Sequence, residues 1–86
     1  MRDLTKIIDS VVKELDSCEF AEKGTLVQRL SAIRTTACYT PPESMATLWH
    51  LTAEALRINL PAPDANAPLW ARRVAAIMMD RAIPDA

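Results

Sequence analysis

The chain has few of the residues on which catalytic, phosphate-binding and metal-binding motifs depend. Its 86 residues include one glycine, one histidine and two cysteines. A single glycine excludes the glycine-rich loops that cradle phosphates. His50 has only Glu54 as a second donor at helical spacing, which is too few for a metal site, so we expect an exposed side chain there. Because no acid–base or nucleophilic constellation is visible either, we expect no enzyme, no catalytic residues and no cofactor.

The chain also lacks an excess of charge of either sign and any long apolar run. It has ten Lys and Arg residues against eleven Asp and Glu residues. Proteins that bind the phosphate backbone usually carry a clear basic excess, so this balance disfavours nucleic acid as a partner. Charged residues interrupt residues 1–16, and no window approaches the roughly 20 apolar residues of a membrane span. We expect a cytoplasmic protein with no membrane contact, whose low net charge does little to oppose self-association.

The two cysteines, Cys18 and Cys38, are too few to form a metal cage on their own. They could form one disulfide, but two small buried thiols in a reducing compartment are the simpler interpretation. An antiparallel pairing of the first two helices would also place residue 38 near the start of the first helix, away from Cys18. We therefore predict that both thiols are free.

Half of the residues are apolar, and their spacing is helical. In residues 3–17 the apolar positions recur every three or four residues, and no segment alternates in the manner of a strand. We predict one all-α domain, residues 1–86, built as a small bundle of about four helices. The expected helices are residues 3–17, 25–38, 41–58 and 67–82, with the first two forming an antiparallel hairpin.

Polar residues suitable as N-caps precede each expected helix. The expected caps are Asp3, then Thr25 in a capping box with Gln28, then Thr40 in a capping box with Glu43, and finally Asn66 or Asp64. Phe20 would fall on the wrong side of the first helix, which should therefore end near Ser17. The pattern leaves open whether residues 18–24 form a loop or a short helical turn.

The third and fourth helices have more apolar surface than a single stripe. In the third helix the apolar residues cover about half the circumference; they are Met45, Leu48, Trp49, Leu51, Ala55, Leu56 and Ile58. The fourth helix has a core face of Trp70, Val74, Ile77 and Met78, and Leu69 and Met79 project to other sides. These residues could fill the core of a monomer or form an interface, because Trp, Met and Arg are enriched at interface centres. The candidate interface comprises Trp49, Leu69, Trp70, Arg72, Arg73, Met78 and Met79.

The segment PPESMATLWHLTAEALRINL resembles the last helix of lambda-repressor-like helix-turn-helix domains. The match rests on Thr47-Leu48, Leu51 and Ala55-Leu56, with one residue inserted in the run. The resemblance implies a small DNA-binding regulator. Independently of it, Arg29, Arg34, Arg72 and Arg73 would form a basic patch if the second and fourth helices adjoin, or would be solvated charges at the rim of an apolar face. The preceding residues 25–40 do not fit, since they are expected to form one helix rather than two around a glycine turn.

The sequence therefore favours a function based on apolar helix faces. The hypothesis is a small non-catalytic protein–protein interaction module: an adaptor, an assembly factor or an inhibitor of a larger bacterial or phage-targeted host protein. Its binding energy would come from burial of apolar surface. The expected partners are a second copy in a homodimer and a larger protein, and a helix-turn-helix-like DNA-binding regulator is the alternative.

Overall fold

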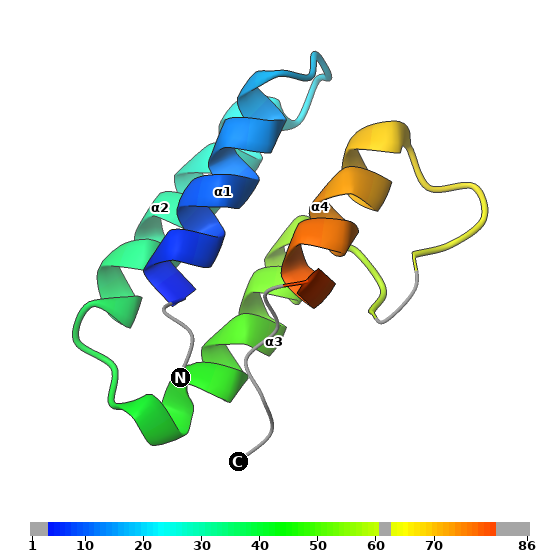
Figure 1. The fold of residues 1–86 in the computed structure, drawn as a ribbon. Helices are drawn as coiled ribbons and strands as arrows, with labels where there is room; N and C mark the ends of the chain where they lie inside the picture. The colour runs from blue at the N-terminus through cyan, green and yellow to red at the C-terminus, as the bar shows by residue number, and fades with distance from the viewer. Residues whose placement is uncertain (1–3, 61–62, 81–86) are drawn as a thin grey trace.

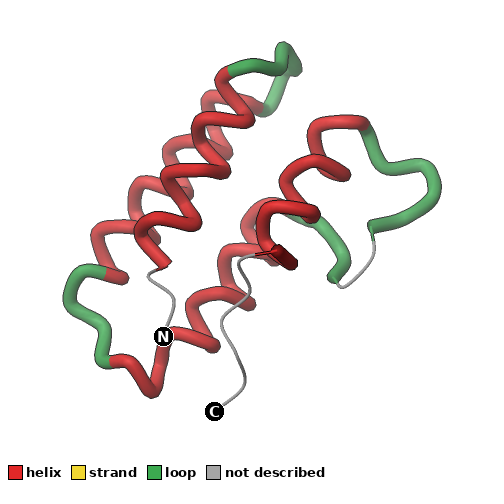
Figure 2. The backbone as a smooth tube through the Cα atoms, viewed as in Figure 1, coloured by secondary structure: helices red, strands yellow, loops and turns green. Residues whose placement is uncertain are grey.

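Every regular element that the structure describes is helical. The computed structural model describes residues 4–60 and 63–80 (Figures 1 and 2). Its elements are α1 (Leu4–Asp16), α2 (Lys23–Ala37), the 3₁₀ helix η1 (Pro42–Ser44), α3 (Met45–Leu56) and α4 (Leu69–Asp80). The predicted four-helix fold is confirmed. The third expected helix is divided into η1 and α3, and the predicted end of the fourth, residues 81–82, lies outside the described residues.

Helix α1 forms the centre of the bundle. It packs against α2, α4 and α3, and Figure 1 shows α2 and α4 on either side of it. Its apolar residues form the stripe that the sequence predicts, and each is at most 1% exposed: Leu4, Ile7, Ile8, Val11 and Leu15. Burial of a complete aliphatic side chain stabilises the fold by roughly 1.5–3 kcal/mol, so this stripe is a main source of stability.

Helices α1 and α2 form the predicted antiparallel hairpin. Leu26, Leu30 and Ala37 of α2 are buried against the core. An ion pair crosses the hairpin: Arg34 Nε donates to Asp9 Oδ1 at 2.7 Å and Nη2 donates to Oδ2 at 3.2 Å. Because both side chains are about half exposed, this pair contributes little to stability.

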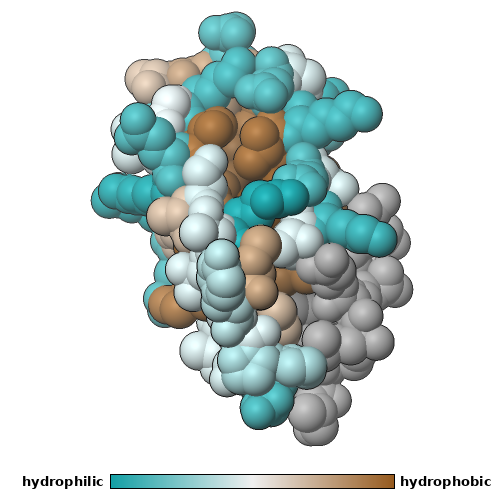
Figure 3. Space-filling model, turned by 90° about the vertical axis from the view of Figure 1, so that its left-hand side faces the viewer, coloured by the Kyte–Doolittle hydropathy of each residue, from teal (hydrophilic) through white to brown (hydrophobic). Residues whose placement is uncertain are grey.

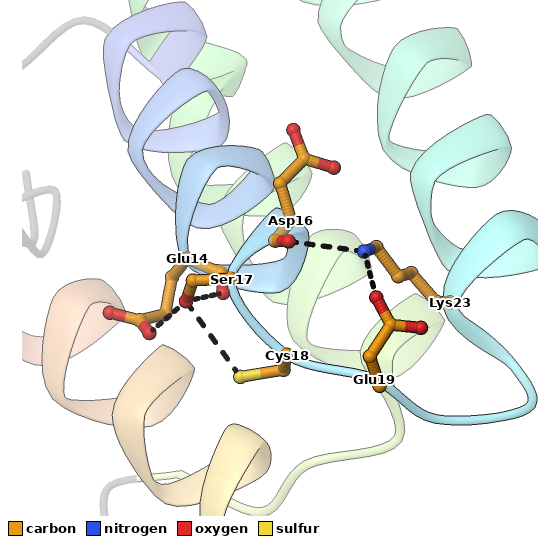
Figure 4. A network of polar contacts seen from close by, with 6 residues as sticks. All are labelled: Glu14, Asp16, Ser17, Cys18, Glu19 and Lys23. Carbon is orange, nitrogen blue, oxygen red and sulfur yellow. Dashed lines mark hydrogen bonds and ion pairs between the residues drawn. The ribbon is translucent and has the colours of Figure 1, made fainter.

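The connection between α1 and α2 is a turn closed by side chains (Figure 4). Ser17 Oγ donates to the Glu14 carbonyl at 2.7 Å, and Lys23 Nζ donates to the Asp16 carbonyl at 3.1 Å. These bonds satisfy carbonyl groups that the last turn of a helix leaves without a partner. The prediction that α1 ends before Phe20 is confirmed. Of residues 18–24, which the sequence left open, 18–22 lie in the turn and 23–24 form the start of α2.

The predicted capping boxes are wrong. Helix α2 begins at Lys23, and its N-cap residue Glu22 makes no side-chain capping bond, so Thr25 lies inside the helix. Thr40 does not cap α3, because its Oγ1 donates backward to the Thr36 carbonyl at 2.7 Å. Prolines and a 3₁₀ turn lead into α3 instead, and Ser44 precedes it without a side-chain bond.

The proposed cap of the fourth helix also differs from the structure. Helix α4 begins at Leu69, directly after Pro68, and is therefore two residues shorter at its start than predicted. Asp64 Oδ1 accepts a hydrogen bond from Asn59 Nδ2 at 3.0 Å. That bond lies within the α3–α4 connection and links residues five positions apart. The predicted cap Asp3 lies outside the described residues.

We expect Thr40→Ala to change the free energy of unfolding by no more than about 0.5 kcal/mol. Water can replace the partly exposed Thr40 hydroxyl at the Thr36 carbonyl, so little is lost. Loss of an N-cap would cost about 0.5–2 kcal/mol. Urea denaturation followed by circular dichroism distinguishes the two, and a loss above about 1 kcal/mol would reinstate Thr40 as a cap.

Helix α3 ends in a left-handed residue, Arg57. Its backbone has φ 56° and ψ 41°. Its N–H donates to the Glu54 carbonyl at 3.0 Å, and the N–H of Ile58 donates to the Ala53 carbonyl at 3.2 Å. This pair of bonds is a Schellman motif, in which glycine is the usual left-handed residue. Arg57 is the only non-glycine residue with positive φ among those described.

We expect Arg57→Gly to raise the free energy of unfolding by about 1 kcal/mol. A side chain in the left-handed region costs about 1–3 kcal/mol, and the greater conformational entropy that glycine loses on folding offsets part of the gain from removing it. The melting temperature of a domain this small should rise by about 4–8 °C. Arg57→Ala is the matched control: it removes the guanidinium but keeps the strain, so it should give no gain. Equal melting temperatures in all three proteins would contradict the assignment of strain to this backbone.

Candidate functional site

Two of the seven candidate interface residues lie in the core. Trp49 is 8% exposed and Met78 is fully buried. The indole Nε1 of Trp49 donates to the Met78 carbonyl at 3.3 Å, which joins α3 to α4 inside the bundle. Both residues therefore stabilise the monomer and offer almost no surface to a partner.

The wide apolar face of α3 is also largely core, although its centre is shifted from the prediction. Its buried residues are Met45, Leu48, Trp49, Thr52, Ala53 and Leu56. The hydroxyl of Thr52 donates to the Leu48 carbonyl at 2.8 Å, so burial leaves it bonded. Leu51, expected on the apolar face, is 46% exposed instead.

The exposed apolar residues of α4 follow one line along the helix. Leu69 is 60% exposed and Met79 is 39% exposed. Arg72 and Ala76 lie between them and are also exposed. We call Leu69, Arg72, Ala76 and Met79 the α4 stripe. Their spacing of three, four and three residues is that of the seam between two paired helices.

The remaining two candidates flank this stripe and have partners within the chain. Arg73 Nη1 lies 3.4 Å from Glu14 Oε2 on α1. Trp70 is half-buried and stacks on Phe20, with ring centroids 4.5 Å apart and planes 5° from parallel. Arg72 belongs to the stripe itself, and its Nη2 donates to the Ala65 carbonyl at 2.7 Å, which positions its side chain over the loop.

Two hollows open beside α4. The larger, of about 480 Å³, lies between the start of α2, the end of α3, the loop 63–68 and the start of α4; we call it the α2–α4 groove. Its apolar lining includes Leu26, Leu56, Ile58, Trp70 and Ala71, and its polar lining includes Glu22, Arg29, Arg57 and Asp64. A shallower hollow of about 340 Å³ lies beside Trp49, His50 and Met79. On the α2 side of the molecule, Figure 3 shows apolar surface set among hydrophilic side chains, without a broad apolar face.

The arginines that could have formed a basic patch are dispersed. Helix α1 lies between α2 and α4 (Figure 1), so those two helices do not pack side by side as the patch would require. Each of the four arginines has its own partner: Arg29 the Ala55 carbonyl, Arg34 Asp9, Arg72 the Ala65 carbonyl and Arg73 Glu14. The exposed residues of α3 are Thr47, His50, Leu51 and Glu54. That surface lacks the cations with which a recognition helix approaches phosphates.

The histidine and the cysteines form no cluster. His50 is exposed, as predicted. Its ring stands nearly perpendicular to that of Trp49, with the ring centroids 5.0 Å apart. Cys18 and Cys38 are both free, as predicted, but Cys38 is exposed because α2 ends at Ala37. Across residues 4–60 and 63–80, no group of three or more His, Cys, Asp or Glu side chains could hold a metal ion.

Comparisons with known proteins add no relative. No protein-family model matches the sequence, and neither a curated protein nor a solved structure does. In the part of the chain that the structure describes, no helix has the length and apolarity to cross a membrane. The class defined by the fold is a small four-helix bundle, and a function must be argued from its surfaces.

Proposed function

We propose that this protein is a non-catalytic protein–protein interaction module that binds through the α4 stripe. The observation that carries the proposal is the exposure of Leu69 and Met79 on the outer side of α4. The inner side of the same helix is already filled, with Ala71, Val74, Ala75 and Met78 at most 3% exposed. The outer apolar residues are therefore not needed for the monomer core.

The stripe suits a helix as its binding partner. Leu69 and Met79 are about 15 Å apart along the helix axis at 1.5 Å per residue, so they would anchor the two ends of a contact. Ala76 between them is small and lets a second backbone approach closely. Burial of exposed apolar area is favourable by roughly 25 cal/mol per Å², and a few such anchors dominate the energy of an interface.

A second copy of the chain is the partner that fits this spacing best. In an antiparallel two-fold pairing of α4 with itself, Leu69 would face Met79 of the partner subunit, and the same contact would recur at the other end. The chain carries a net charge of only −1, so two copies repel each other weakly. A larger protein would bind by presenting an amphipathic helix to the same stripe.

Sedimentation equilibrium at micromolar concentrations tests the proposal. We expect a mass twice the 9.5 kDa of the monomer, and we expect the double variant Leu69→Asp, Met79→Asp to sediment as a monomer with unchanged helicity. Leu51→Asp is the matched control, because it places the same charge on an exposed leucine outside the stripe and should remain dimeric.

The outcome that would contradict the dimer is a wild-type protein that remains strictly monomeric at high micromolar concentration. Dissociation by Leu51→Asp to the same extent as by the stripe variants would also count against α4, because it would show an effect of charge alone. Salt-sensitive binding to duplex DNA that the stripe variants leave unchanged would favour the DNA-binding alternative.

A further inference from the structure

Arg57 combines a strained backbone with an unpartnered side chain. It occupies the left-handed position at the end of α3 that usually belongs to glycine. Its side chain is exposed and lines the α2–α4 groove. No hydrogen bond or ion pair links its guanidinium to another described residue. The two hydrogen bonds of the helix end account for the backbone conformation, whereas the guanidinium is left available to a ligand.

A second guanidinium lies at the same end of the groove. Arg29 of α2 also lines the groove, and its Nη1 lies 3.4 Å from the carbonyl oxygen of Ala55, two residues before Arg57. That single long hydrogen bond uses one of the five N–H donors of the group. The end of the groove next to α3 therefore offers two cations with free donors, the arrangement that binds carboxylates and phosphates best.

The opposite end of the groove carries a negative charge. Glu22 precedes Arg29 by seven residues, which is about 10 Å along α2, and it makes no ion pair within 4.0 Å among the described residues. Between the two ends, the lining includes the nearly buried side chains of Leu26 and Ile58 and the half-buried Trp70. The groove thus has a lining of mixed polarity, with two arginines where α2 meets the end of α3 and the acidic side chains of Glu22 and Asp64 elsewhere in the lining.

We propose that the α2–α4 groove binds a short peptide segment of another protein, in which an Asp or Glu carboxylate adjoins a large apolar side chain. The carboxylate binds Arg29 and Arg57, and the apolar side chain packs against the half-buried Trp70 and the exposed Pro68, which both line the groove. Thr25 and Asn66, which also line the groove and have no partner among the described residues, are available to the peptide backbone. Glu22 favours a basic group at the other end of the peptide and so fixes its direction.

A peptide fits these charges better than a nucleic acid does. A phosphate backbone carries one negative charge per nucleotide and binds along a continuous row of cations. In this groove the acidic residues Glu22 and Asp64 share the lining with the two arginines. They would repel a run of phosphates along the groove more strongly than a single carboxylate that binds at Arg29 and Arg57.

Selection of a displayed library of random dodecapeptides on the intact protein tests the proposal. We expect enriched sequences in which Asp or Glu adjoins Leu, Ile, Phe or Trp. The affinity of a synthetic peptide of the enriched sequence should fall at least about tenfold in Arg57→Gly and in Arg29→Gln. Because Arg57→Gly is expected to stabilise the fold, loss of binding in that variant cannot be attributed to unfolding.

Two controls separate this site from other effects. Lys13→Gln removes one positive charge from an exposed position of α1 outside the groove, and it should leave the affinity unchanged. The double variant Leu69→Asp, Met79→Asp should bind the peptide normally, because the α4 stripe is a different surface. The peptide site and the α4 stripe can therefore fail independently of each other.

Three results would overturn the proposal. The first is a library that yields no enriched acidic–apolar sequence. The second is a selected peptide whose affinity is the same in wild type, Arg57→Gly and Arg29→Gln. The third is a single-stranded oligonucleotide that binds in a manner dependent on both arginines, since that would assign the guanidiniums to phosphates.

Discussion

Replacing Ile8 by alanine is expected to lower the free energy of unfolding by about 2–5 kcal/mol, because it leaves a cavity that neighbouring helices cannot fill completely. Ile8 is fully buried in the middle of α1, the helix that packs against each of the other three. A domain of this length has a total stability of roughly 4–13 kcal/mol. The substitution should therefore remove a large part of it.

Urea denaturation followed by circular dichroism measures this loss. Val12→Ala is the matched control: it removes methyl groups from the same helix at a half-buried position. It should cost about 1 kcal/mol or less, because a partly exposed site loses less transfer energy and leaves no closed cavity. Equal losses in the two variants would contradict the placement of Ile8 at the centre of the bundle.

The success of the sequence in predicting α1 has a simple physical cause. A helix that buries one stripe repeats its apolar residues at a period set by its own geometry, so Leu4, Ile8, Val11 and Leu15 reveal the buried side without any knowledge of the neighbours. The end of α1 was predictable for the same reason, since Phe20 does not fit that stripe. The exposure of Leu69 and Met79 on α4 follows from the same argument, because both lie off the buried face.

The capping predictions failed because a local motif has competing uses. The Thr40 hydroxyl can accept a hydrogen bond from an N–H group of the following helix or donate one to a carbonyl group of the preceding helix. The sequence of the motif is compatible with both. In the structure the backward bond to Thr36 is formed. Pro41 and the 3₁₀ turn then separate Thr40 from the first turn of α3, whose N-cap residue is Ser44.

The sequence predicts how much of α3 is apolar, but not which of these apolar residues are buried in the core. The pattern shows how much of the circumference is apolar, whereas burial depends on how many helices surround it. Trp49 contacts α4 through Met78, 29 residues later in the chain, and so becomes part of the core. The α2–α4 groove escaped the sequence analysis for the same reason: Arg29 meets the end of α3 only in the folded chain.

The stack of Phe20 on Trp70 is the contact with the second-largest expected effect on stability. It joins the α1–α2 turn to the first turn of α4, two segments 50 residues apart, with ring centroids at 4.5 Å. Truncation of a fully buried Phe costs about 3–5 kcal/mol. Because Phe20 is only half-buried, we expect Phe20→Ala to cost about 2 kcal/mol.

A double-mutant cycle isolates the contribution of the stack itself. Phe20→Leu and Trp70→Leu each keep most of the apolar volume but remove the aromatic contact. The energy of the contact is therefore counted in the stability loss of each single variant, but only once in the loss of the double variant. We expect a coupling energy of about 0.5–1.5 kcal/mol, the range for aromatic pairs beyond their buried area. Additive losses would show that the two rings are merely adjacent. The turn at residues 17–22 would then be held by its hydrogen bonds without a contribution from the stack, and the wall of the α2–α4 groove that contains Trp70 would be free to move apart from α2.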